Sequence, residues 1–149
     1  VPSDRPPGPM TVVVSTGVAD SDPVTVTVQD VAPAIFGDAA SGFGAIQVAH
    51  SGQWTNVRPA APGDFIEIYT TGLGPVHATP DGLEVTDQPV KVFLGDQEIL
   101  DVPYHGLVPG YSGLYQINAR IPIGTLPGLY PIVIEIAGRP SNSFNILVQ

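Results

Sequence analysis

The chain has 149 residues, enough for one well-buried domain or for one domain with part of another. Seventeen Gly and seventeen Pro leave little room for long helices, and fourteen acidic residues against five basic ones would repel a nucleic-acid backbone. Cysteine is absent and no apolar run reaches the ~20 residues of a membrane helix, so disulfides, thiolate metal sites and a membrane span are not expected.

The apolar residues are mainly Val, Ile, Leu and Ala in short runs between turn-forming residues, a pattern typical of an all-β protein. Several runs alternate in polarity, as Val24, Val26 and Val28 do around Thr25 and Thr27, which a half-buried strand requires. The predicted strands are Thr11–Ser15, Pro23–Gln29, Gly44–His50, Asp64–Gly72, Val90–Leu94, Gln97–Val102, Gly113–Ile121, Tyr130–Ala137 and Ser143–Gln149.

Turn signals and strand number indicate the architecture. Leu94-Gly-Asp-Gln97 predicts a tight hairpin, and Ala137-Gly-Arg-Pro-Ser141 predicts a longer one. The strands after residue 44 match the number in an immunoglobulin-type sandwich. We therefore expect an immunoglobulin-like β-sandwich over residues 30–149, with an additional N-terminal β-hairpin and a Pro-rich lead within residues 1–29.

An internal repeat links the two ends of the chain. Residues 10–29 and 130–149 share one plan: an apolar strand, a polar turn, and a second alternating strand ending in Val-Gln. The second segment ends at Gln149, 120 residues after Gln29. A repeat of domain-sized period predicts tandem or polymeric modules.

The first hairpin is surplus if residues 30–149 already form a sandwich, and it resembles the final hairpin of a preceding module. A lone hairpin is marginally stable in water, so its apolar side needs a partner. The predicted assembly interface consists of Val12, Val14, Val24, Val26 and Val28. Three outcomes remain open: the hairpin packs on its own domain, completes a sheet in a neighbouring chain, or is the tail of an upstream domain. The Pro-rich opening at residues 1–9 is expected to be held by a partner.

Side chains with catalytic or metal-binding chemistry are sparse. His50, His77 and His105 are widely spaced, and no Gly-x-Ser-x-Gly nucleophile motif is present, so neither an enzyme nor a zinc site is predicted. Acidic turns at Asp20-Ser-Asp22, Asp38, and Asp81 with Glu84 offer oxygen ligands for calcium, but Asp and Ser also build such turns. We predict no metal and no cofactor.

Four segments resemble a bacterial protein family. They are Val28-Gln-Asp-Val-Ala-Pro-Ala-Ile-Phe36, Gly44-Ala-Ile46, Pro62-Gly-Asp-Phe-Ile-Glu-Ile-Tyr-Thr-Thr-Gly-Leu-Gly-Pro75 and Leu114-Tyr-Gln-Ile-Asn118. Over about residues 24–149 the chain resembles the Solibacter-type uncharacterised C-terminal domain of large secreted bacterial proteins. The resemblance implies an immunoglobulin-like, secreted module of unassigned activity, and it supplies no functional residues.

The expected function follows from the hairpin. We expect an extracellular or cell-surface structural subunit that assembles head-to-tail with copies of itself into a filament through its N-terminal strands. The alternative is a carbohydrate-binding or adhesive module of a larger secreted protein, in which Trp54 and Tyr111 would contact a glycan. We also expect that Ser or Thr side chains carry covalent O-glycans.

Overall fold

The computed structural model describes residues 6–149, so the first five residues of the Pro-rich lead lie outside the described residues. The chain divides into two compact units, the first ending at Asp30 and the second spanning Val31–Gln149. The described residues form strands and turns without a helix, which confirms the predicted all-β class.

The first unit is a two-stranded antiparallel sheet. Its strands are β1 (Gly8–Val12) and β2 (Val24–Val28). The sequence predicted this hairpin, but β1 begins earlier than expected and includes Pro9. Proline is tolerated there because β1 is an edge strand, in which the lack of an N–H on the unpaired side removes no hydrogen bond between strands.

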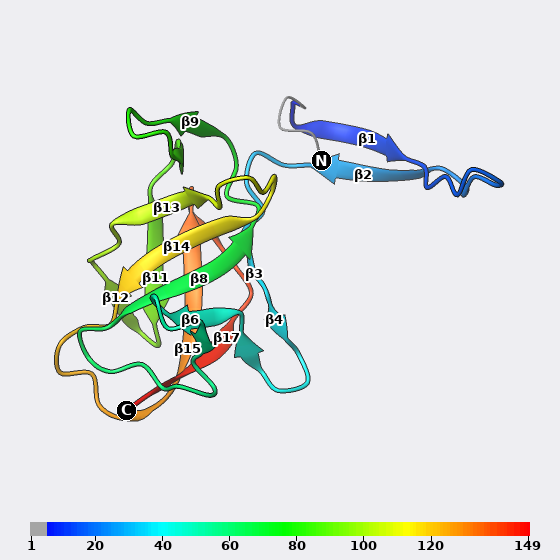
Figure 1. Ribbon diagram of the computed structural model, residues 1–149. Helices are drawn as coiled ribbons and strands as arrows, with labels where there is room; N and C mark the ends of the chain where they lie inside the picture. The colour runs from blue at the N-terminus through cyan, green and yellow to red at the C-terminus, as the bar shows by residue number, and fades with distance from the viewer. Residues whose placement is uncertain (1–5) are drawn as a thin grey trace. The chain divides into compact units, whose positions relative to one another are not determined.

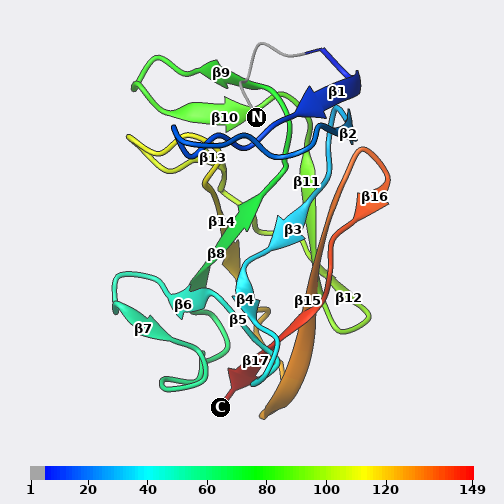
Figure 2. The ribbon, with the colours of Figure 1, turned by 90° about the vertical axis from the view of Figure 1, so that its right-hand side faces the viewer.

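The second unit consists of two sheets packed face to face (Figure 1; Figure 2). One sheet has the order β7-β6-β8-β14-β13-β10-β9, and β3 also pairs with β8. Its strands are β3 (Ala34–Ile35), β6 (Ile46–Val48), β7 (Gln53–Trp54), β8 (Phe65–Thr71), β9 (Val76–Ala78), β10 (Glu84–Thr86), β13 (Tyr104–Leu107) and β14 (Tyr115–Arg120).

The other sheet has the order β12-β11-β15-β17-β5-β4, and β16 also pairs with β15. Its strands are β4 (Gly37–Asp38), β5 (Phe43–Gly44), β11 (Val90–Leu94), β12 (Gln97–Ile99), β15 (Gly128–Ile136), β16 (Arg139–Pro140) and β17 (Phe144–Val148). All named strand pairs are antiparallel except β17 with β5. Figure 1 shows β8 and β14 crossing in front of β15, and Figure 2 shows the two layers from the side.

The core lies between the sheets and is built by alternation. In β8 the buried hydrophobic side chains are Ile66 and Ile68, and in β15 they are Ile132, Ile134 and Ile136. These side chains are at most 1% exposed, so each contributes about 2 kcal/mol of burial before ordering entropy is subtracted. The β-sandwich architecture follows from this core, while the immunoglobulin-like assignment stays a prediction.

The two predicted hairpins are both present, with one difference. Leu94 faces Gln97 across the two-residue loop Gly95–Asp96, and Gly95 has a φ of 59°, as the first central residue of a II′ turn does. The hairpin after β15 is shorter than predicted, because Ile136 pairs with Arg139 across only Ala137 and Gly138. Ala137 adopts a φ of 50°, a conformation that sequence reasoning does not expect of alanine.

Candidate interaction surface of the N-terminal hairpin

The register of β1 and β2 sorts their side chains onto two faces. Met10 lies opposite Val26, and Val12 lies opposite Val24. Directly opposed residues of an antiparallel pair point to the same side of the sheet. One face therefore carries Met10, Val12, Val24, Val26 and Val28, which we call the apolar face. The other face carries Pro9, Thr11, Thr25 and Thr27.

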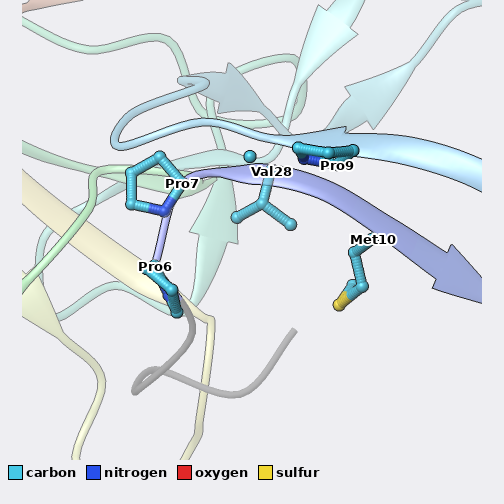
Figure 3. A pocket seen from close by; sticks show the side chains of 6 residues that line it. Pro6, Pro7, Pro9, Met10 and Val28 are labelled. Carbon is cyan, nitrogen blue, oxygen red and sulfur yellow. The ribbon is translucent and has the colours of Figure 1, made fainter.

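The apolar face is open to solvent. Val12 and Val26 are 38% and 39% exposed, and Val24 is 59% exposed. Met10 and Val28 are half-buried beside Pro6 and Pro7, where these residues surround a hollow of about 160 Å³. Figure 3 shows Met10 and Val28 pointing to one side of the hairpin and Pro9 lying on the other. A continuous apolar strip with this exposure is typical of an interaction site.

Four of the five predicted interface residues lie within the strands of this face. The fifth, Val14, follows β1, at the end of the hairpin closed by a bridge between Ser15 and Asp20. Val14 is 64% exposed, and its N–H donates to Ser21 Oγ at 3.1 Å. Sequence reasoning missed Met10, because the predicted strand started at Thr11.

Both long edges of the hairpin are unpaired among the described residues. β1 pairs with β2, and neither strand pairs with a third. Free N–H and C=O groups along a strand edge accept further strands readily. The hairpin thus offers an apolar face and two open edges.

Trp54 and Tyr111, the candidate glycan contacts, lie on separate elements. Trp54 is on β7, 45% exposed, with its ring edge-on to Tyr69 at 6.0 Å between centroids. It borders a hollow of about 340 Å³ that Phe43 and Asn56 also line. Tyr111 is 62% exposed in the loop between β13 and β14. The aromatic ring that contacts Trp54 is that of Tyr69, not that of Tyr111.

A polar cluster next to Trp54 was not predicted from the sequence. Glu67 is 8% exposed on the outer face of β8, and its carboxylate accepts a hydrogen bond from Gln47 Nε2. The same Nε2 also contacts the hydroxyl of Tyr69 at 2.9 Å. Burial, with a further contribution from Glu67, raises the pKa of Tyr69. The alternation Phe65-Ile-Glu-Ile-Tyr69 carried the signal, since it places Glu67 and Tyr69 on one face.

The three histidines lie in separate surroundings. His77 Nδ1 is 2.8 Å from Asp87 Oδ1 at the surface, and His105 Nδ1 is 2.6 Å from Thr86 Oγ1. Burial lowers the pKa of His105, against a smaller opposing effect of a backbone hydrogen bond. His50 occupies a turn with a φ of 59°.

The acidic turns are organised by local hydrogen bonds. Asp38 accepts from the backbone of Ala40 and Ser41, and hydrogen bonding led by Ser41 lowers its pKa. Asp81 accepts from the hydroxyl of Thr79. Within residues 6–149, His, Asp and Glu side chains form no group of three that would hold a metal ion.

The same described part of the chain contains no helix that is long and apolar enough to cross a membrane. A scan against protein-family models and searches of curated proteins and of solved structures gave no match to this chain.

Proposed function

We propose that this chain is a structural subunit of an extracellular head-to-tail assembly, and that it is not an enzyme. Its joint is the hairpin β1–β2, whose apolar face packs on a β-sandwich of another subunit. The observation that carries the proposal is the exposed apolar face, with Val12, Val24 and Val26 between 38% and 59% exposed.

The energetics favour burial of this face. Fully burying a valine side chain contributes about 2 kcal/mol, so covering the exposed parts of the apolar face contributes on the order of 5 kcal/mol before ordering. An isolated two-stranded hairpin is marginally stable, so it gains most from such a contact. Main-chain pairing along an open edge adds to the same contact.

The geometry of such a joint sets the form of the assembly. The hairpin and the sandwich that receives it are different surfaces of the same chain, so the contact is heterologous. A heterologous contact between identical subunits propagates and gives a filament unless its rotation closes a ring. Filaments are therefore the product that we propose.

The extracellular location is part of the proposal. Support for it comes from the resemblance of residues 24–149 to a domain of secreted bacterial proteins, and from an acidic composition with a single lysine, Lys91. The net charge of -9 also limits nonspecific association, so the apolar face is the expected contact.

The test compares the full chain with the double variant Val12→Thr/Val26→Thr. Threonine keeps the shape and strand preference of valine while placing two hydroxyls on the apolar face. We expect the full chain to form oligomers that grow with concentration in sedimentation velocity, and filaments in electron microscopy. The variant is expected to associate at least about tenfold more weakly.

The matched control is Thr25→Ser/Thr27→Ser, which alters the opposite face of the same strand. It should associate as the full chain does. Monomers of the full chain at every concentration would overturn the proposed function, and so would equal weakening by the control.

A second candidate, carbohydrate binding, is favoured by the surroundings of Trp54. Its exposed ring stands beside a hollow and beside the polar side chains of Gln47 and Glu67, as sugar stacking with hydrogen bonding requires. Titration with soluble cello-, xylo- and manno-oligosaccharides should then change Trp54 fluorescence, and Tyr111→Ala should not affect this change. An unchanged spectrum with all three would exclude these sugars.

A further inference from the structure

The hairpin β1–β2 has the same strand register as the hairpin formed by β15 and β17. Gly8 pairs with Val28, and Gly128 pairs with Val148. All five residue pairs of β1–β2, through to Val12 with Val24, recur in β15–β17 at an offset of 120 residues on each strand. The sequence repeat therefore extends to the pairing of the backbone.

The far ends of the two hairpins also agree. The bridge between Ser15 and Asp20 recurs as the pair Glu135 and Pro140. The residue that begins the turn has a positive φ in both hairpins, 80° at Gly17 and 50° at Ala137.

An equivalent serine closes both hairpins with the same three hydrogen bonds. Ser21 Oγ accepts from the N–H of Val14 at 3.1 Å, and Ser141 Oγ accepts from the N–H of Ile134 at 3.1 Å. Each serine N–H donates back to the same partner's carbonyl, at 3.0 Å for Ser21 and 2.8 Å for Ser141. Each hydroxyl then donates to the carbonyl of the next residue, at 3.0 Å and 2.6 Å. The second turn residue differs, because Gly138 has a positive φ and Val18 does not. Agreement in register, closing bridge and serine hydrogen bonds shows that the two hairpins are one structural element in two copies.

The two copies differ in what surrounds them. Val12, Val14 and Val26 are 38–64% exposed, whereas their equivalents Ile132, Ile134 and Ile146 are 0% exposed. The open edge of β1 corresponds to the edge of β15 that pairs with β11, and the open edge of β2 corresponds to the edge of β17 that pairs with β5. The apolar face and the two open edges of the first copy thus correspond to surfaces that are buried, partly buried or paired in the second.

We propose that β1–β2 is the last hairpin of a second β-sandwich of the same kind as Val31–Gln149, which precedes it in a tandem series on one polypeptide. The inference shares one assumption with the proposed function, namely that the hairpin packs in a sandwich other than its own. The place between β11 and β5 in Val31–Gln149 is already filled by β15 and β17, so the hairpin needs the corresponding place in another sandwich. The 120-residue offset is the period of the series.

The side chains specify the partner further. Val12 and Val26 stand where the second copy has Ile132 and Ile146, and Val24 stands where it has Phe144. The preceding sandwich therefore needs bulkier residues opposite this hairpin, because protein cores are packed to a constant density.

The test is a fusion in which residues 31–127 are followed directly by residues 8–149. The first sandwich then lacks β15–β17 and has β1–β2 in their place, and the second sandwich is intact. Amide hydrogen exchange across residues 8–28 should slow by at least about 100-fold relative to the dilute full chain, as for a strand inside a folded core.

The matched control exchanges neighbours within the strands: Thr11→Val/Val12→Thr, Val24→Thr/Thr25→Val and Val26→Thr/Thr27→Val. It keeps the composition but turns the valines to the other face, so residues 8–28 should exchange rapidly. A third fusion carries Val12→Ile, Val24→Phe and Val26→Ile, which restores the bulk of the second copy. If the unaltered fusion fails to fold only because valines leave its core underfilled, this fusion should still fold. It should show the slowest exchange in the hairpin.

Rapid exchange of residues 8–28 in both the unaltered and the bulk-restored fusions would overturn the tandem proposal. Equal protection in the face-exchanged control would overturn it too, since the contact would then lack the predicted register. If separate copies of the full chain associate while the fusions leave the hairpin unprotected, the hairpin acts between molecules and the tandem proposal is wrong. Protected fusions with a monomeric full chain would retain the tandem proposal and reject the filament.

Discussion

Gly72 lies where the chain leaves β8 and passes against the segment that enters β3. Its φ is 75°, its carbonyl accepts a hydrogen bond from Ala32 at 2.8 Å, and a Cβ added to it would stand 1.9 Å from the carbonyl oxygen of Ala32. The glycine is therefore needed both for its conformation and for the close approach of two backbones.

The variant Gly72→Ala should lower the free energy of unfolding by at least about 3 kcal/mol, from left-handed strain of ~1–2 kcal/mol plus displacement of the Ala32 backbone. Urea unfolding followed by Trp54 fluorescence measures the effect. Gly82→Ala is the matched control, since Gly82 has a φ of 83° but no atom within 4 Å of the added Cβ. Equal losses in the two variants would contradict the close-approach argument.

His105 links the stability of the sandwich to pH. Its pKa is lowered by burial, so as the pH falls below about 6.5 the unfolded chain takes up a proton before the folded chain does. With respect to this group, the free energy of unfolding should therefore be constant at pH values well above 6.5 and should decline as the pH falls below about 6.5. His105→Gln should reduce this decline, measured as the midpoint of urea unfolding at each pH. A decline unaffected by His105→Gln would show that another group is responsible.

At this scale the sequence predicted that Val24, Val26 and Val28 share one face of a strand, through their strict alternation with Thr25 and Thr27. It did not predict that Glu67 would be nearly buried on an outer face. That burial depends on Gln47 from β6 and Asn118 from β14 lying on either side of Glu67, which are long-range pairings that no local pattern encodes.

At the scale of elements, loss of the same serine hydroxyl should have different effects on stability in the two hairpins. Ser141→Ala removes the hydroxyl that accepts from the N–H of Ile134 and donates to the carbonyl of Asn142, and should lower the free energy of unfolding of the sandwich by about 1 kcal/mol. Ser21→Ala removes the equivalent bonds from the other unit and should leave the sandwich unchanged. Trp54, the single tryptophan, reports the unfolding of Val31–Gln149 in both variants. A comparable loss from Ser21→Ala would contradict the independence of the two units.

Every strand predicted from the sequence has a counterpart in the structure, but several short strands were missed. β9 and β10 have three residues each, too few for their apolar alternation to stand out in the sequence. β13 follows Pro103 and contains Gly106, both of which count against a strand by composition. These strands form because β14 supplies a paired edge for β13, which then extends the sheet to β10 and β9.

The whole molecule combines a complete sandwich with one surplus hairpin. The sequence predicted the all-β class and the repeat of 120 residues, because both depend on local pattern. It could not show that the two hairpins share a register, a bridge and a serine bond, since these depend on which backbone atoms meet.

The measurement that tests the central claim most directly is amide hydrogen exchange in the full chain, at low and at high protein concentration, with β15 as the internal reference. If the hairpin is completed from outside its own molecule, residues 8–28 exchange rapidly in dilute solution and become protected as the concentration rises, while β15 stays protected throughout. Protection of residues 8–28 equal to that of β15 in dilute, monomeric protein would show that the hairpin is already satisfied within its own molecule, and would contradict the account.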